Sequence, residues 1–310
     1  MSETTRGGGV HIVGVHGIGQ GRTNEVRLAY DWGNALARGL RRRPGATGTA
    51  VPALTVPHYT GLYKPDAPGG GRHLGLGPGP GLADAELPGA DGPMDEREEE
   101  FVLQALTAYA PGPLPEARPH QGTLGAPLPY VPGAVTRRLA AADARHGRGA
   151  GTKVLVLVRQ AYRYLYEEEL GEQIRKVIRA EVERSGARVL IAHSLGSVIA
   201  YDMLHRRELR DPGIHTLLTC GSPLGWLTVR RGLPGDAHVA VPEWLAWHNF
   251  HADGDPVTGG AGLAHVVTSG SLLDTRVNNG LAAPHDAVRY LAQADVADTV
   301  AALTADDTPL

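Results

Sequence analysis

Short apolar runs alternate with stretches of helical periodicity along most of the chain. Residues 10–15 form a β-branched run, and a helix is expected from the N-cap residue Asn24 to about residue 43, where a Pro-Gly pair stops it. A second strand at 50–56 contains a proline, which favours the edge of a sheet. Further strands are expected at 153–158, 187–192, 214–219, 247–251 and 264–268, and helices at 160–184, 195–207, 285–293 and 296–302. This alternation predicts an α/β fold with a doubly wound, mostly parallel sheet.

Residues 61–150 interrupt the alternation. The segment 64–93 is dominated by Gly, Pro and Ala, so it buries too little apolar surface to offset the entropy of ordering and is expected to be a long loop. Helices are expected at 95–110, where the first turn is acidic, and at 133–146. We therefore expect one domain over residues 1–310, in which 61–150 is an insertion or a cap over the site.

Charge and composition exclude several classes of partner. The 310 residues include 30 Lys+Arg and 33 Asp+Glu, and a formal charge of -3 implies no general attraction to nucleic acid. No apolar stretch approaches the roughly 20 residues of a membrane helix, and residues 1–9 lack the apolar core of a signal peptide, so we expect a cytoplasmic protein. The single cysteine, Cys220, ends an apolar run and is expected in the core, which excludes an intrachain disulfide. These features do not define an oligomeric state.

The segment 189–200 carries the most specific chemical signal. An apolar run leads through His193 to Ser194 and continues as an apolar helix, which is the setting of a nucleophile elbow. The residues two before and two after the serine must be small because strand and helix crowd there. Ala192 and Gly196 meet that need, although the common pattern has glycine at both positions. The alternative is an ordinary helix N-cap serine, but the flanking strand and apolar helix favour a nucleophile.

A glycine-rich loop, residues 16–21, follows the first strand. A nucleophilic serine needs two backbone N–H groups for the oxyanion, one after the nucleophile and one from a loop near the first strands. Leu195 is expected to supply the first and Ile18 the second, with Gly17 as the alternative. A nucleotide-binding interpretation fails because the loop lacks both the G-x-G-x-x-G spacing and a G-K-[ST] motif.

The acid and the base follow from chain order, which in hydrolases with this elbow is Ser, then Asp or Glu, then His. The turn after the strand at 247–251 contains Asp253 and Asp255. Asp255 is preferred because the proline that follows it fixes the backbone, and Asp253 is the second choice. Among 14 histidines we expect His285 as the base, because it lies in a late loop before a helix. His265, within the predicted last strand, is expected to be a packing residue.

A family resemblance rests on Val-His-Gly-Ile-Gly-Gln at 15–20, Ala-His-Ser-Leu-Gly at 192–196, Cys-Gly-Ser-Pro-Leu-Gly at 220–225, Asp-Pro-Val at 255–257, and His285 before a helix. With these motifs the chain resembles bacterial lipase-like or esterase-like members of the α/β-hydrolase superfamily. The resemblance covers the first strand region and residues 153–295, but not 61–150. It implies an α/β-hydrolase fold and a serine hydrolase that cleaves a carboxylic ester or related acyl bond through an acyl-enzyme on Ser194.

The expected ligand is a small-molecule acyl substrate. We expect substrate contacts from His16, His193, Leu224 and Trp226, although core packing explains the tryptophan at least as well. No H-E-x-x-H motif or cysteine set is present, so we expect neither a metal nor a cofactor. A thioesterase, an amidase or an acyltransferase would use the same triad. The alternative from another class is a non-catalytic ligand-binding protein on a hydrolase scaffold.

Overall fold

The computed structural model describes residues 10–18, 20, 23–43, 51–63, 93–114, 131–235 and 237–306. The chain divides into two compact units, one formed by Met1–His58 with Glu172–Leu310 and the other by Tyr59–Gly171. Residues 1–9, which lack the apolar core of a signal peptide, and most of the loop expected at 64–93 lie outside the described residues.

The first unit is built on a parallel sheet. In the described part of the chain this sheet has six strands in the order β2-β1-β3-β4-β6-β8. The strands are β1 (His11–Val15), β2 (Ala53–Thr55), β3 (Val189–His193), β4 (Thr216–Cys220), β6 (Ala246–Ala252) and β8 (Leu273–Val277). The chain leaves β1 toward one edge of the sheet and returns on its other side at β3. In open α/β sheets, ligands bind at such a reversal, beyond the carboxyl ends of the strands.

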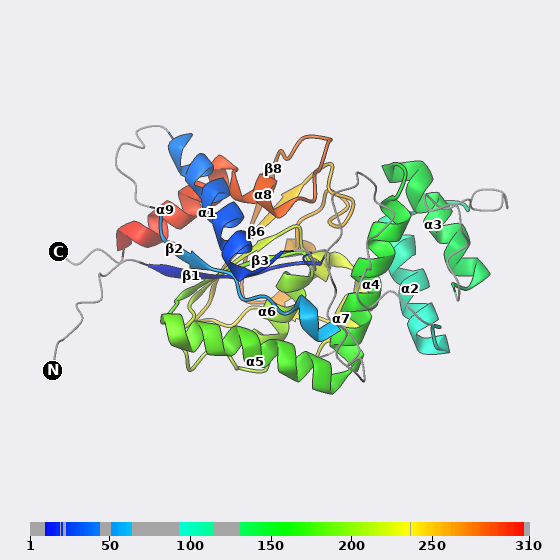
Figure 1. Ribbon diagram of the computed structural model, residues 1–310, viewed down its shortest axis with the longest axis horizontal. Coiled ribbons are helices and arrows are strands. Elements are labelled where there is room, and N and C mark those ends of the chain that lie inside the picture. Colours follow the sequence, from blue (N-terminus) through cyan, green and yellow to red (C-terminus); the bar gives the residue numbers. More distant parts are fainter. Residues whose placement is uncertain are drawn as a thin grey trace, which may run out of the picture. The chain divides into compact units, whose positions relative to one another are not determined.

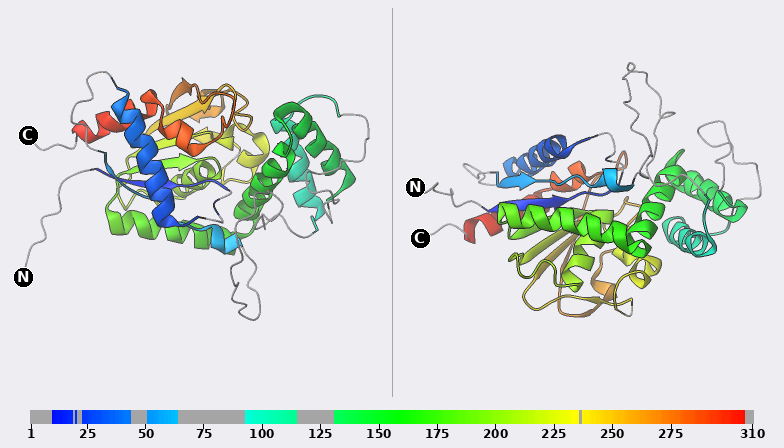
Figure 2. Two further views of the ribbon diagram at one scale, coloured as in Figure 1. Left: turned by 45° about the horizontal axis from the view of Figure 1, so that its top comes forward. Right: turned by 60° about the horizontal axis from the view of Figure 1, so that its bottom comes forward.

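Helices cover both faces of this sheet (Figures 1 and 2). One face carries α1 (Glu25–Arg41), α8 (Ala287–Leu291) and α9 (Ala294–Asp306), and the other carries α5 (Glu168–Ser185) and α6 (Leu195–His205). The expected N-cap is confirmed, because the Asn24 side chain accepts a hydrogen bond from the Arg27 N–H at 2.9 Å. Every residue of β3 and β4 is buried, as expected for central strands covered on both faces.

The predicted last strand at 264–268 is wrong. Residues Ala264–Val266 form the 3-10 helix η4, and β7 (Val267–Ser269) pairs with β5 (Val239–Ala240) in a separate two-stranded sheet. One edge of the main sheet is β2, and the other is β8, a half-exposed strand that gives no apolar run to detect in the sequence. His265 is exposed in η4 and is therefore not a packing residue. Between β4 and β5 lie η3 (Pro223–Gly225) and α7 (Leu227–Arg231).

The second unit contains η1 (Thr60–Tyr63) and three helices that pack on one another: α2 (Glu96–Tyr109), α3 (Gly133–His146) and α4 (Ala150–Tyr166). The helices expected at 95–110 and 133–146 are confirmed. The Asp95 carboxylate caps α2 by accepting the Glu98 N–H at 2.7 Å, in keeping with the acidic first turn.

The strand expected at 153–158 is also wrong, because these residues belong to α4. Residues 154–158 are buried on all sides of this helix, and a short apolar run cannot distinguish a buried helix from a buried strand. The helix expected at 160–184 is consequently two helices, since α4 ends at Tyr166 and α5 begins at Glu168. The second unit thus extends to Gly171, beyond the segment 61–150 that the sequence set apart.

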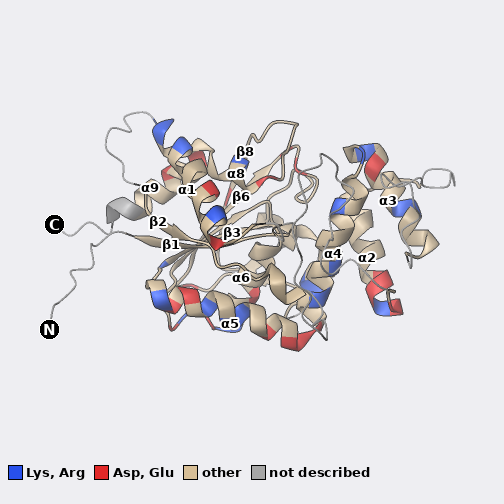
Figure 3. Cartoon of the chain, viewed as in Figure 1, with Lys and Arg blue, Asp and Glu red and all other residues tan. Residues whose placement is uncertain are grey.

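Charges of both signs are interspersed on the helices, most clearly along α5 (Figure 3). On that helix Arg184 pairs with Glu181 at 2.6 Å, and such exposed pairs add little to stability. None of the helices in the described ranges is long and apolar enough to cross a membrane.

Within the second unit, Arg159 of α4 pairs with Glu98 of α2 at 2.7 Å, and the two side chains are only 5% and 9% exposed. We expect Glu98→Ala to lower the free energy of unfolding by about 3–5 kcal/mol, because it removes one partner of a buried ion pair. Urea denaturation followed by circular dichroism measures this. The control is Glu167→Ala, which removes the partner of Arg163 in a more exposed pair and should cost at most about 1 kcal/mol. Equal losses in both variants would contradict the expectation.

Candidate active site

Ser194 occupies the turn between β3 and α6 in a conformation that is rare for a residue with a side chain. Its φ is 53° and its ψ is -127°, and the residue is fully buried. The Ser194 N–H donates to the Cys220 carbonyl at 3.1 Å, which ties the turn to the end of β4. Such strain costs about 1–3 kcal/mol and persists only where the surroundings impose it.

The surroundings impose it through close backbone contacts. A Cβ at Gly196 would lie 2.1 Å from the carbonyl oxygen of Val15, so only glycine fits there. A Cβ at Gly17 would lie 2.8 Å from the Cβ of Ser194. The loop after β1 is therefore pressed against the serine, as the elbow interpretation requires, whereas Ala192 shows that the position two before the serine accepts a methyl group.

The structure brings the three predicted side chains into line. His285 Nε2 lies 2.9 Å from Ser194 Oγ, and His285 Nδ1 lies 2.9 Å from Asp255 Oδ2. Ser194 lies in the turn after β3, Asp255 in the turn after β6 and His285 in the loop after β8. All three positions are at the carboxyl edge of the sheet. The Ser194 and Asp255 side chains are inaccessible, whereas that of His285 is 27% exposed. In this geometry Nδ1–H donates to the carboxylate, and Nε2 is free to accept the serine proton.

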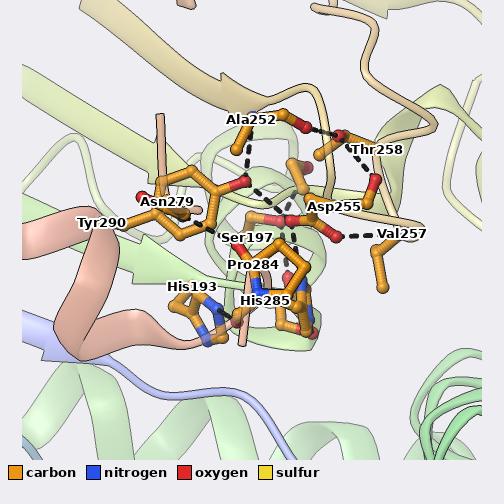
Figure 4. A network of polar contacts seen from close by, with 12 residues as sticks. His193, Ser197, Ala252, Asp255, Val257, Thr258, Asn279, Pro284, His285 and Tyr290 are labelled. Carbon is orange, nitrogen blue, oxygen red and sulfur yellow. Dashed lines mark hydrogen bonds and ion pairs between the residues drawn. The ribbon is translucent and has the colours of Figure 1, made fainter. Parts of the chain in front are cut away.

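The Asp255 carboxylate is buried but well supplied with donors (Figure 4). Its Oδ1 accepts the Val257 N–H at 2.8 Å, and its Oδ2 accepts the Tyr290 hydroxyl at 2.6 Å in addition to His285. Burial alone would raise the pKa of Asp255, but the charge of His285 and the hydrogen bonds from all three donors outweigh it. The pKa is therefore lowered. The group is consequently ionised at neutral pH.

Asp253, the second choice for the acid, lies elsewhere. Its exposed carboxylate pairs with Arg276, and the hydrogen bond from that guanidinium lowers the pKa of Asp253. Asp255 is thus the carboxylate that contacts the predicted base.

The loop that carries His285 is held by residues that the sequence did not single out. Asn279 is buried and donates through Nδ2 to the Pro284 carbonyl at 2.7 Å, while Gln293 donates to its Oδ1 at 3.0 Å. In the sequence, Asn279 stands in an Asn-Asn-Gly stretch typical of a solvated turn, so no local signal marks it. Tyr290 likewise falls within the helix expected at 285–293, where nothing in the sequence marks its hydroxyl.

Two further histidines are buried beside the site. His193 lies with Nε2 2.7 Å from the His285 carbonyl oxygen, and its ring centroid is 4.8 Å from that of His285. His16 Nδ1 lies 2.6 Å from the Gly17 carbonyl oxygen. Burial is the main cause that lowers the pKa of His193 to about 3 and that of His16 to about 4, so both rings are neutral at pH 7.

The remaining predicted residues take these places. Leu195 is the first residue of α6, so its N–H is among those that lack an acceptor within the helix, and Ile18 lies in the loop after β1. Leu224 of η3 and Trp226 just after it are buried. Their contact with a substrate, like that of His16 and His193, stays a prediction.

A hollow of about 650 Å³ is lined by Asp253, Gly254 and residues 276–281. Ser194 and His285 do not line this hollow, so it is separate from the three aligned side chains. In the described ranges no group of three or more His, Cys, Asp or Glu side chains is placed to hold a metal ion.

Comparison of the chain with models of known protein families, with curated proteins and with solved structures found no match. The class of protein is therefore defined by the structure alone, as an α/β fold with a parallel central sheet flanked by helices.

We expect Gly196→Ala to lower the free energy of unfolding by about 1–3 kcal/mol or more, because the new methyl group meets a backbone carbonyl that cannot move aside. The matched control is Gly33→Ala in α1, where nothing lies within 4 Å and the change should stabilise by about 0.4–1 kcal/mol. Thermal unfolding of both variants measures the difference. A Gly196→Ala variant as stable as the wild type would show that the turn is looser than described.

Acid should destabilise the fold through the buried histidines. In the unfolded chain a histidine titrates near 6.5, whereas His193 and His16 titrate near 3 and 4, so between these values only the unfolded state binds the protons. Stability should therefore fall as pH drops below about 6.5, by up to about 1.4 kcal/mol per pH unit for each ring. Urea titrations between pH 6.5 and 4.5 should give a shallower slope for His193→Gln than for the wild type. An unchanged slope would contradict the assignment.

Proposed function

We propose that the protein is a serine hydrolase of the α/β-hydrolase type that cleaves a carboxylic ester or related acyl bond. The observation that carries the proposal is the continuous hydrogen-bonded path from Asp255 through His285 to Ser194. The strained turn at Ser194 supports it further, because strain of this kind concentrates at functional sites.

The proposed reaction has two halves. Ser194 Oγ attacks the acyl carbon while His285 Nε2 takes its proton, and the oxyanion is held by the N–H groups of Leu195 and Ile18. His285 then gives the proton to the leaving oxygen, and an acyl-enzyme remains on Ser194. A water molecule, deprotonated by His285, attacks the acyl-enzyme and releases the acid, with the proton returned to Ser194. Asp255 holds the imidazole tautomer throughout.

Thioester, amide and acyl-transfer chemistry would use the same three side chains, because they differ in the leaving group and in the access of water. A binding protein without catalysis would not need an ionised carboxylate, an imidazole and a hydroxyl in line. The aligned hydrogen bonds therefore favour catalysis over binding alone.

A fluorophosphonate probe should label Ser194 in the folded protein. After trypsin digestion the adduct should lie on the peptide 189–206, and fragment ions should place it on Ser194 and not on Ser197. Ser194→Ala should abolish labelling, and Asp255→Asn should slow it by about 10³- to 10⁴-fold, because the imidazole loses its correct tautomer.

The control is Ser271→Ala, which removes an exposed serine and should label at the wild-type rate. Absence of labelling of the folded wild-type protein would contradict the hydrolase proposal and favour a binding protein. Chromogenic esters of increasing acyl length would then define the substrate of a protein that does label.

A further inference from the structure

The hydroxyl of Tyr290 links the predicted acid to the end of a strand (Figure 4). It lies 2.6 Å from Asp255 Oδ2, and it accepts the Ala252 N–H at 3.1 Å. A phenol has a single proton, and the backbone N–H can only donate to it. The hydroxyl must therefore point its own proton at the carboxylate.

The rest of Tyr290 is fixed by packing. The side chain is fully buried in an apolar cluster that includes Trp32 and Leu36 of α1 and Ile191 of β3. Burial, and then the charge of Asp255, raise the pKa of Tyr290 well above its ordinary value, so the hydroxyl keeps its proton at neutral pH.

We propose that Tyr290 is a positioning residue for the reaction, because its hydroxyl fixes the Asp255 carboxylate in the orientation that receives His285 Nδ1–H. This inference rests on the proposed function. The terminal torsion of an aspartate is soft, so the carboxylate needs donors to set its plane. The Val257 N–H holds Oδ1 and Tyr290 holds Oδ2, which leaves the second lone pair of Oδ2 for His285.

Other titratable groups face this pair from the neighbouring elements. His193 at the end of β3 lies with its ring centroid 6.2 Å from that of Tyr290, and Cys220 ends β4. Burial raises the pKa of the Cys220 thiol and lowers that of His193, so both are neutral at pH 7. Asp255 is thus the charged group that acts on Tyr290.

The test is Tyr290→Phe, which keeps the ring and removes the hydroxyl. The matched control is Tyr201→Phe, because the buried Tyr201 hydroxyl accepts the Ala240 N–H at 3.0 Å and lies 3.4 Å from the His238 carbonyl, remote from the acid. Tyr290→Phe should lower the rate of fluorophosphonate labelling, and kcat for p-nitrophenyl butyrate, by about 10- to 100-fold with little change in KM. Tyr201→Phe should leave both rates unchanged, although both variants lose stability.

A second readout does not require activity. The His285 Nδ1 proton, shared with a carboxylate, should give a far-downfield proton resonance that disappears in Asp255→Asn. In Tyr290→Phe it should move upfield, because a carboxylate whose plane is no longer held forms a longer hydrogen bond with Nδ1–H.

The outcomes separate the two claims. If the wild type is not labelled, the proposed function fails, and the position of the resonance alone decides the role of Tyr290. The inference is overturned if Tyr290→Phe leaves the resonance in place, whether or not the rate changes, because the effect would then not pass through Asp255. If Tyr290→Phe does not fold, the chemical shift of the Tyr290 hydroxyl proton, assigned with ¹³C-labelled tyrosine, is compared between the wild type and Asp255→Asn. An identical shift in the two proteins also overturns the inference, because the hydroxyl would then not donate to Asp255.

Discussion

The close approach of three backbone segments at Ser194 is the constraint on which the site depends. A parallel sheet brings the ends of β1, β3 and β4 together, and the strained serine fits between them because glycine stands at 17 and 196. The N–H of Ser194 is then fixed to the end of β4, and its hydroxyl points at the imidazole of His285. Local strain in one residue is thus maintained by contacts between segments that are far apart in sequence.

The same parallel arrangement explains how the acid and the base reach that serine. The carboxyl ends of parallel strands share one edge, so the segments that follow β3, β6 and β8 meet there although 91 residues separate Ser194 from His285. Once they meet, a buried carboxylate is tolerable only if its oxygens are hydrogen-bonded. Asp255 satisfies this condition with donors from its own turn, from the loop that holds His285 and from α8.

The sequence allowed prediction of those parts that depend on local rules. Spacing and residue type predict the tight turn at Ser194 and the N-cap at Asn24. The chain order expected of an elbow selects Asp255 and His285, which the structure brings into contact. Residues 153–158 were expected as a strand but belong to helix α4. A helix that is buried on all sides shows no apolar–polar periodicity, so its sequence cannot be distinguished from that of a buried strand. The edge strand β8 could not be predicted because it contains no apolar run. The role of the Tyr290 hydroxyl could not be predicted because its acceptor, Asp255, lies 35 residues away in the sequence.

The protonation states of the buried neighbours determine what the carboxylate can do. His193 and Tyr290 are both neutral at pH 7, as the directions of their pKa shifts require. His193 therefore does not compete as a cation for the charge of Asp255, and Tyr290 adds no second negative charge beside it. In a site of low dielectric constant that charge acts mainly on His285. In the proposed reaction, an imidazole that gains a proton from Ser194 would therefore be stabilised at the moment of transfer, which is the task of an orienting acid. The buried neutral groups and the donors to Asp255 together favour a single path for the proposed proton transfer.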